Sequence, residues 1–133
     1  FIMSAGLNQI TILGRLGNDP ITRDTRTETT VTHFDVAVDE SYKSKTGDKV
    51  EKVTWFRCEA WNGRGKAIAQ YLGKGNRILV NGHMDFRQYE KAIVLNGQEG
   101  TVKINDPVLI VEDFKIIDWK DDNPGDGFDQ DEL

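Results

Sequence analysis

The nine residues from Val53 to Trp61 alternate between two kinds of side chain, and this alternation constrains the fold more than any other feature. Phe56, Cys58 and Ala60 are apolar enough for a core, whereas the intervening positions are Val53, Trp55, Arg57, Glu59 and Trp61. Successive side chains of a β-strand point to opposite faces, so a period of two is typical of a strand with one face buried. The segment therefore predicts a strand whose outer face carries two tryptophans and an arginine.

Four further segments have the composition of strands and are separated by turn-forming residues. They are residues 9–16, 31–38, 77–89 and 101–117. In the third of these, Phe86 has the parity of Ile78 and Val80, which predicts that Phe86 lies in the core, opposite Tyr89. In the last segment, Pro107 predicts a bulge or an edge position because proline has no amide hydrogen to donate to a neighbouring strand.

Two loops and one helix complete the pattern. Residues 42–52 are polar and lysine-rich and contain Gly47-Asp48, so they predict a long cationic hairpin loop, and residues 96–100 predict a second hairpin loop. Apolar residues at helical spacing in residues 63–72 predict one short helix. Three strands, a helix and two more strands give the order of an all-β OB-fold, a five-stranded Greek-key barrel with one short helix between strands three and four.

The length of 133 residues fits one folded domain. We expect residues 1–7 to be a flexible N-terminal segment in which Phe1 and Ile2 are a cloning remnant, residues 8–118 to form the barrel, and residues 119–133 to be a disordered tail. No apolar run is long enough for a membrane span, so a soluble intracellular protein without membrane contact is expected. Cys58 has no cysteine partner and no zinc-ligand spacing is present, so neither a metal nor a cofactor is expected.

The net charge of -5 is concentrated in the tail. Residues 1–119 contain 16 basic and 16 acidic side chains, whereas residues 120–133 contain six acids and Lys120 alone. A neutral body can still present a basic groove, because the local potential rather than the total charge steers a polyanion. Composition therefore neither supports nor excludes a nucleic-acid partner.

The outer face of the Val53–Trp61 strand combines aromatic with cationic side chains, and the strand at residues 77–89 places Arg77, Arg87 and Tyr89 on its own outer face. Aromatic rings stack on unpaired bases of any identity, while arginine and lysine neutralise phosphates. The pattern therefore predicts binding of single-stranded nucleic acid without sequence preference.

Each of these residues also has a structural interpretation. In that interpretation, Trp55 and Trp61 pack in a protein interface, and Arg57 and Arg87 form ion pairs with Glu59 or Glu90. The lysines of the hairpin loop are then only solvated side chains without a ligand. His33 and His83 are more typical of surface histidines than of ligands or catalytic bases.

Several segments, in order and with similar spacing, resemble the bacterial and phage single-stranded DNA-binding proteins (SSB). They are residues 8–20 (NQITILGRLGNDP), 54–58 (TWFRC), 71–75 (YLGKG) and 80–82 (VNG). The resemblance implies that Tyr42, Trp55, Trp61 and Tyr89 stack on bases, and we expect Lys43, Lys45, Lys49, Arg57 and Arg87 to contact phosphates. It also implies a homotetramer, with a dimer as the alternative, and a role in replication, recombination and repair. The expected location is the cytoplasm and nucleoid of a bacterial or phage-infected cell.

Bacterial members of that family end in an acidic stretch that docks onto replication and repair enzymes. The corresponding expectation here is a docking tail formed by Phe128, Asp129, Asp131, Glu132 and Leu133. It departs from the family pattern because Phe128 lies inside the tail and the chain ends in Asp-Glu-Leu.

Two other classes of function are weighed against this one. An enzyme has little support. Residues 63–67 (GRGKA) superficially resemble a phosphate-binding loop, but the position of its first glycine is Ala60, and Ala67 stands where the loop needs a hydroxyl residue. An OB-fold adaptor of the primosomal kind would instead bury the aromatic side chains in a protein interface.

Overall fold

The computed structural model describes residues 5–120. Residues 1–4 and the docking tail expected at residues 128–133 lie outside these described residues. The described chain is β1 (Ile10–Leu16), β2 (Ile21–Asp24), β3 (Thr30–Asp39), β4 (Tyr42–Lys43), β5 (Lys49–Val50), β6 (Val53–Trp61), α1 (Asn62–Tyr71), β7 (Arg77–Leu95) and β8 (Gln98–Ile116). No helix in residues 5–120 is long and apolar enough to cross a membrane.

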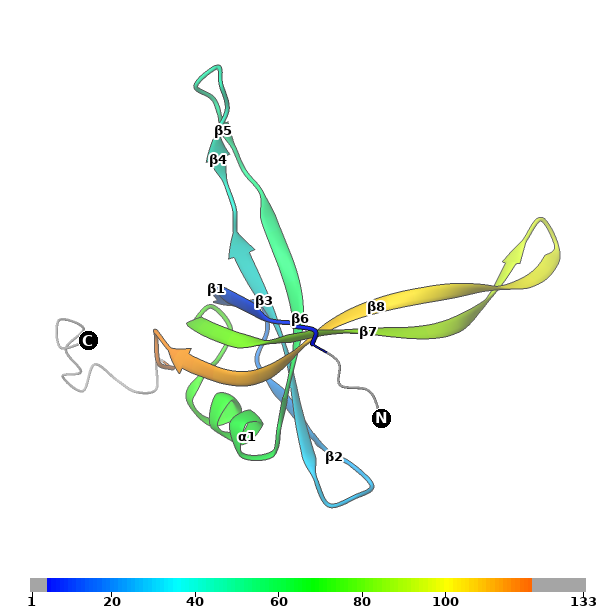
Figure 1. Ribbon diagram of the computed structural model, residues 1–133, viewed down its shortest axis with the longest axis horizontal. Coiled ribbons are helices and arrows are strands. Elements are labelled where there is room, and N and C mark those ends of the chain that lie inside the picture. Colours follow the sequence, from blue (N-terminus) through cyan, green and yellow to red (C-terminus); the bar gives the residue numbers. More distant parts are fainter. Residues whose placement is uncertain (1–4, 121–133) are drawn as a thin grey trace.

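Five of the strands close into a barrel, which confirms the predicted OB-fold (Figure 1). The strand order is β1-β7-β8-β6-β3, and an additional pairing of β1 with β3 closes the circle. All pairs are antiparallel except β6 with β8, which run parallel. The short strand β2 extends the sheet beyond β3, and α1 lies between β6 and β7 in the chain, as predicted.

The core lies inside the barrel and under α1. It contains the inward-facing side chains of the barrel strands, among them Phe34, Cys58, Ile78 and Leu109, each at most 1% exposed. Ile68 of α1 and Leu72, which follows the helix, belong to the same cluster, so the helix covers the core. The period-two pattern that defined the inner face of β6 is therefore confirmed at Cys58 and Ala60.

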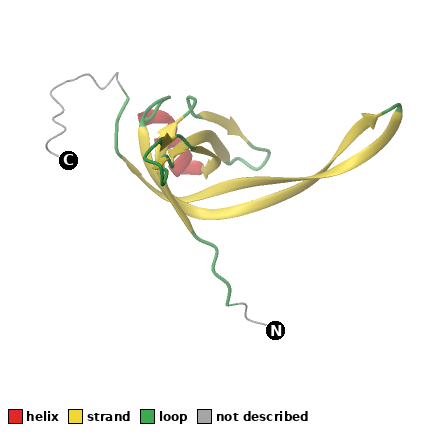
Figure 2. Cartoon of the chain, turned by 90° about the horizontal axis from the view of Figure 1, so that it is seen from above, coloured by secondary structure: helices red, strands yellow, loops and turns green. Residues whose placement is uncertain are grey.

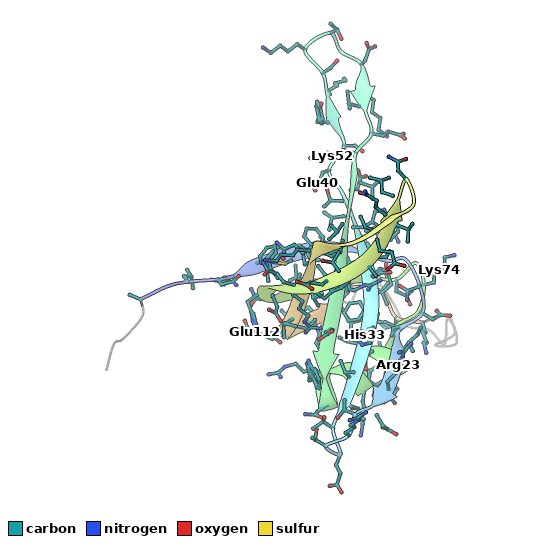
Figure 3. All side chains as sticks on the ribbon, turned by 90° about the vertical axis from the view of Figure 1, so that its right-hand side faces the viewer. Arg23, His33, Glu40, Lys52, Lys74 and Glu112 are labelled. Carbon is teal, nitrogen blue, oxygen red and sulfur yellow. The ribbon has the colours of Figure 1, made fainter. Side chains whose placement is uncertain are left out.

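Two hairpins extend from the barrel in different directions (Figure 1). The region predicted as a cationic loop forms a short ribbon of β4 and β5, and a backbone hydrogen bond from Glu40 to Lys52 lies at its root (Figure 3). The outer parts of β7 and β8 form a long curved arm that ends at a turn at Asn96-Gly97 (Figure 2). Both turn residues have positive φ angles, 53° and 79°, as expected for a two-residue hairpin turn.

The arm corrects the prediction for Phe86, which is 59% exposed rather than buried in the core. Its cross-strand partner is Pro107, whereas the parallel pairing of β8 with β6 begins only at Leu109. Phe86 has inward parity, but the two strands have already left the barrel at this point. Pro107 pairs with a strand on one side only, through Phe86 of β7, in agreement with the predicted edge position, and no register shift occurs there.

The irregularity in the β7–β8 ladder lies instead at Gly82. Gly82 pairs with Val111 while the preceding Asn81 pairs with Asp113, so β8 contains one extra residue here. A Cβ atom on Gly82 would collide with the backbone carbonyl oxygen of Ile110. Only glycine therefore allows the two backbones to approach at this bulge.

We expect Gly82→Ala to lower the free energy of unfolding by about 2 kcal/mol or more, because backbone cannot move aside as a flexible side chain does. Gly100→Ala is the matched control in the same ladder, since a Cβ atom there meets nothing within 4 Å. Urea denaturation followed by circular dichroism measures both. Equal midpoints for the two variants would contradict the close approach.

Candidate nucleic-acid interface

The outward-facing side chains of β6 and their neighbours form one continuous surface, called here the outer face. From β6 it contains Trp55, Arg57, Glu59 and Trp61. Directly opposite residues in a ladder point to the same side, so Ala37, Asp35 and His33 of β3 join it through their pairing with Trp55, Arg57 and Glu59. The parity of β8 and β7 adds Ile110, Val108, Asp85, Arg87 and Tyr89.

Trp55 is the most exposed aromatic side chain of β6, at 59%. Its ring packs closely against Gly17, where a Cβ atom would collide with the indole carbons. Gly17 follows β1 and donates its amide to the carbonyl oxygen of Asp35, which fixes this turn against β3. The indole therefore packs closely against this turn, while more than half of the side chain stays exposed to solvent.

Trp61 lies at the opposite end of β6 and is 38% exposed. It occupies the N-cap position of α1, so the start of the helix fixes its backbone. The two tryptophans are six residue steps apart along the strand, which corresponds to roughly 20 Å. Trp55 and Trp61 therefore form two separate contact points on one face, with Arg57 and Glu59 between them.

A cleft of about 270 Å³ lies beside Arg57 on the outer face. Arg23 of β2 and His33 of β3 line it together with Asp35 and Arg57, and Figure 3 shows Arg23 and His33 close together. The guanidinium of Arg57 lies 3.7 Å from the carboxylate of Asp35, and both side chains are largely exposed. Arg23 was not predicted from the sequence, because β2 lacks a strong strand pattern.

Glu59 and Arg87 form the tightest ion pair of the outer face. Arg87 donates hydrogen bonds from Nη1 and Nη2 to the two carboxylate oxygens of Glu59, at 2.6 and 2.8 Å, and from Nε to Asp85 at 3.2 Å. His33 lies 3.7 Å from the same carboxylate. The hydrogen bonds to Glu59 raise the pKa of Arg87 above its ordinary value. This pairing is the structural alternative that the sequence had left open for Arg87.

The other expected binding residues lie on the two hairpins. Tyr89 is exposed on the arm, two residues beyond Arg87 and on the same side of β7. Tyr42 is exposed on β4, where its cross-strand partner is Val50, and the next pair along this ribbon is Lys43 with Lys49. The four expected stacking residues are thus distributed over the barrel and both hairpins rather than gathered in one cluster.

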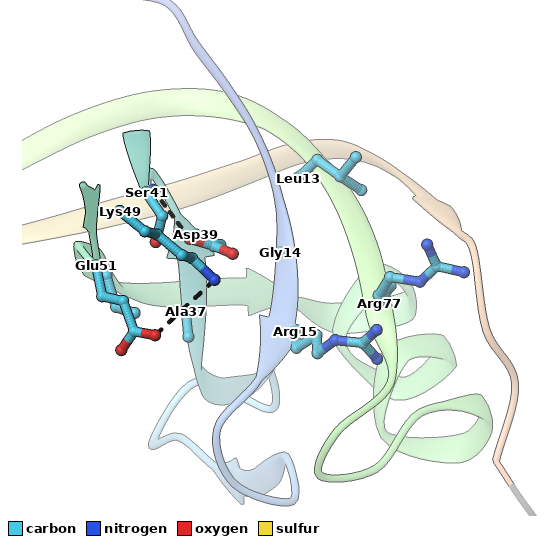
Figure 4. A pocket seen from close by; sticks show the side chains of 10 residues that line it. Leu13, Gly14, Arg15, Ala37, Asp39, Ser41, Lys49, Glu51 and Arg77 are labelled. Atoms are coloured by element: carbon cyan, nitrogen blue, oxygen red, sulfur yellow. Dashed lines mark hydrogen bonds and ion pairs between the residues drawn. The ribbon is translucent and has the colours of Figure 1, made fainter. Parts of the chain in front are cut away.

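A larger groove of about 580 Å³ lies between β1, β7 and the root of the β4–β5 ribbon (Figure 4). Arg15, Arg77 and Lys49 line it, as do Asp39 and Glu51. Its basic groups are paired, since Arg77 binds Asp118 at 2.9 Å and Lys49 lies 3.9 Å from Glu51. The hydrogen bonds from Arg77 lower the pKa of Asp118, and those from Ser41 lower the pKa of Asp39.

Cys58 lies behind the outer face, in the core, and is fully buried. Burial raises the pKa of its thiol to about 12, so the thiolate is not populated at neutral pH. The described residues contain no cluster of three or more His, Cys, Asp or Glu side chains that would hold a metal ion.

Comparison with known proteins identifies the family. The model of the single-strand binding protein family matches residues 7–116. The chain belongs to this family. The match extends from the segment before β1 through the end of β8, and therefore includes the arm and the last barrel strand.

Curated relatives come from bacteria and from mitochondria. Single-stranded DNA-binding protein 1 of Chlorobaculum tepidum is 34% identical over 88 residues, which are 66% of this chain and 54% of that protein. This chain thus spans about half the length of that relative. The mitochondrial single-stranded DNA-binding protein of Danio rerio is 30% identical over 120 residues, covering 85% and 82% of the two chains.

A solved structure supports the fold independently. The chain in the structure described as a Plasmodium falciparum SSB complex with ssDNA superposes with a TM-score of 0.69 at 24% sequence identity. The match covers 88% of this chain and 100% of that chain. The single-strand binding family and this structure agree on the OB-fold barrel.

The Glu59–Arg87 pair generates a stability prediction. Replacing Arg87 with methionine would leave a buried carboxylate without its main partner, and we expect a loss of roughly 2–3 kcal/mol in the free energy of unfolding. The loss stays below that of a fully buried pair because the Arg87 side chain is 42% exposed. Arg57→Met is the matched control, since its exposed pair with Asp35 is worth about 0.5 kcal/mol or less. Equal losses in urea denaturation would show that the Glu59 carboxylate does not need Arg87.

The burial of Cys58 generates a second prediction. At pH 8 the native protein should react with an aromatic disulfide reagent at least a hundredfold more slowly than the protein in denaturant, because both access and thiolate formation are suppressed. Absorbance of the released thiol measures both rates. A rapid reaction of the native protein would contradict the burial of Cys58.

Proposed function

We propose that this chain binds single-stranded DNA without sequence preference and thereby sequesters it, rather than catalysing a reaction. The carrying observation is the exposure of Trp55 and Trp61 on one supported face of β6, in a chain that belongs to the single-strand binding protein family. The names of its bacterial and mitochondrial relatives describe the same activity for those proteins.

The mechanism follows from the chemistry of an unpaired strand. Bases exposed by strand separation stack on Trp55 and Trp61, and the strand continues to Tyr42 on one hairpin and Tyr89 on the other. Each stacked base contributes roughly 1–3 kcal/mol, and the contact does not depend on base identity. A duplex keeps its bases stacked internally, so it offers no equivalent faces. Binding therefore competes with duplex re-formation.

Phosphate contacts in this proposal come from Arg57 and from the lysines of the β4–β5 ribbon, Lys43, Lys45 and Lys49. Within residues 5–120, neither Lys43 nor Lys45 forms an ion pair, and the pairs of Lys49 and Arg57 are long and exposed. Such cations exchange a carboxylate for a phosphate at little cost. Arg87 was expected to belong to this set, but its guanidinium is hydrogen-bonded to Glu59 and Asp85.

The proposal includes self-assembly, with a homotetramer favoured and a dimer as the alternative. β1 pairs with β3 only at Arg15 and Leu16, so its edge from Ile10 to Gly14 lacks a second strand partner among the described residues. In this proposal another copy of the chain pairs with the unpaired edge, because an open edge is a template for strand pairing. Several small barrels linked together would bind a long strand with higher avidity. Docking of replication and repair proteins through Phe128–Leu133, and action in the bacterial or phage-infected cytoplasm, also remain proposals.

The function is tested by titration with oligo(dT) and with a matched duplex, following intrinsic tryptophan fluorescence. Quenching by the single strand alone is expected, because only unpaired bases reach Trp55 and Trp61. No response to either ligand would favour the protein-adaptor alternative.

Among single variants, Trp55→Ala should weaken oligo(dT) binding roughly 10- to 100-fold, as expected for the loss of one stacking platform. Trp119→Phe is the matched control. Trp119 packs edge-on against Tyr71 at the end of α1, with ring centroids 5.2 Å apart, and the proposal gives it no contact with DNA. An equal loss of affinity in both variants would contradict the proposed path of the strand.

A further inference from the structure

Glu59 is an unusual residue for a surface that is proposed to bind a polyanion. It lies on the outer face between Trp55 and Trp61, yet it is only 3% exposed. Within residues 5–120 it is the one Asp, Glu, Lys or Arg side chain that is buried. A buried carboxylate is costly unless it is paired, so its partners reveal what it does.

Its main partner reaches it from a different part of the sheet. Arg87 belongs to β7, whereas Glu59 belongs to β6, and β8 lies between these strands in the sheet. All three guanidinium nitrogens of Arg87 lie within hydrogen-bonding distance of carboxylate oxygens, two toward Glu59 and one toward Asp85. A fork-to-fork pair of this kind fixes direction as well as distance. No guanidinium nitrogen is left without a carboxylate.

The pair also lies where the arm leaves the barrel. The register of β6 with β8 contains two Cα pairs, Cys58 with Leu109 and Glu59 with Ile110. Arg87 is paired with Asp106, beyond this short seam and at the root of the arm. The Glu59–Arg87 bond therefore ties the first residues of the arm to β6. Tyr89 follows two residues later on the same side of the strand.

We propose that Glu59 is a positioning residue for the DNA-binding face: it holds Arg87 as a strut that orients the arm and Tyr89, and it removes Arg87 from the cations that contact phosphate. This inference rests on the proposed function. It replaces the expected phosphate contact of Arg87 with a structural one. Of the two arginines expected to contact phosphate, only Arg57 then remains exchangeable.

The inference has a measurable consequence in the salt dependence of binding. Each cation that neutralises a phosphate of a single strand steepens the plot of log affinity against log salt by about 0.7. Arg87 does not contribute to this slope while Glu59 and Asp85 neutralise it. Loss of the Glu59 charge leaves Arg87 with Asp85 alone, an exposed pair that exchanges readily for phosphate.

The experiment measures the affinity for oligo(dT) by tryptophan fluorescence between 50 and 500 mM salt. Glu59→Gln should steepen the slope by about 0.7, so that its affinity relative to the unmodified protein falls about fivefold across this range. The double variant Glu59→Gln with Arg87→Gln should return to the original slope. Asp106→Asn is the matched control, because Asp106 is an acid directly opposite Arg87 on the same face that forms neither an ion pair nor a hydrogen bond with it. Its slope should stay within experimental error of the original.

The outcomes separate this inference from the function on which it rests. If the unmodified protein does not bind oligo(dT), the proposed function itself fails. If it binds, and the double variant has a slope shallower by about 0.7, Arg87 contacts phosphate and the inference is overturned. Equal steepening in Glu59→Gln and Asp106→Asn would also overturn it, because removal of any nearby acid would then suffice. Thermal unfolding of each variant verifies that the compared proteins are folded.

Discussion

Closure of the barrel depends on two short seams. β1 meets β3 over two Cα pairs, and β6 meets β8 over two more, whereas the β3–β6 and β7–β8 ladders are long. A small barrel closes only if its strands tilt and stagger, so some neighbours touch over a short length. At the β6–β8 seam, the Glu59–Arg87 bond adds a side-chain link to the few backbone hydrogen bonds.

The same geometry gives the outer face its shape. Long strands continue past the short seams as ribbons. β3 and β6 lead into the β4–β5 hairpin, and β7 and β8 continue as the arm. The barrel thus holds Trp55 and Trp61 on a rigid surface, while Tyr42 and Tyr89 lie on extensions that have solvent on both sides. A face of this design offers fixed contacts at its centre and adaptable ones at its periphery, which suits a flexible ligand without a defined sequence.

Sequence patterns predicted the parts of the fold that depend on local alternation. The bounds of β6 and the inward parity of Cys58 and Ala60 agree with the structure, because one face of this strand is continuously buried. The prediction failed at Phe86, where alternation continues but the barrel does not. Parity shows to which face of a strand a side chain points. Whether that face is buried depends on which other strands cover it, and long-range pairing decides this.

The candidate site shows the same limit. The aromatic residues were found from parity and family resemblance, but neither signal shows whether an arginine is available to a ligand. Arg57 and Arg87 look equivalent in the sequence, and both lie on the outer face. They differ in the acid with which each is paired. Arg57 lies 3.7 Å from the exposed carboxylate of Asp35, whereas Arg87 lies 2.6 Å from the buried carboxylate of Glu59. A buried carboxylate that released its arginine to a phosphate would be left as an unpaired charge away from water, which is costly. An exposed carboxylate is solvated by water instead. The burial of the acid, rather than the identity of the base, therefore decides which cations are available to DNA.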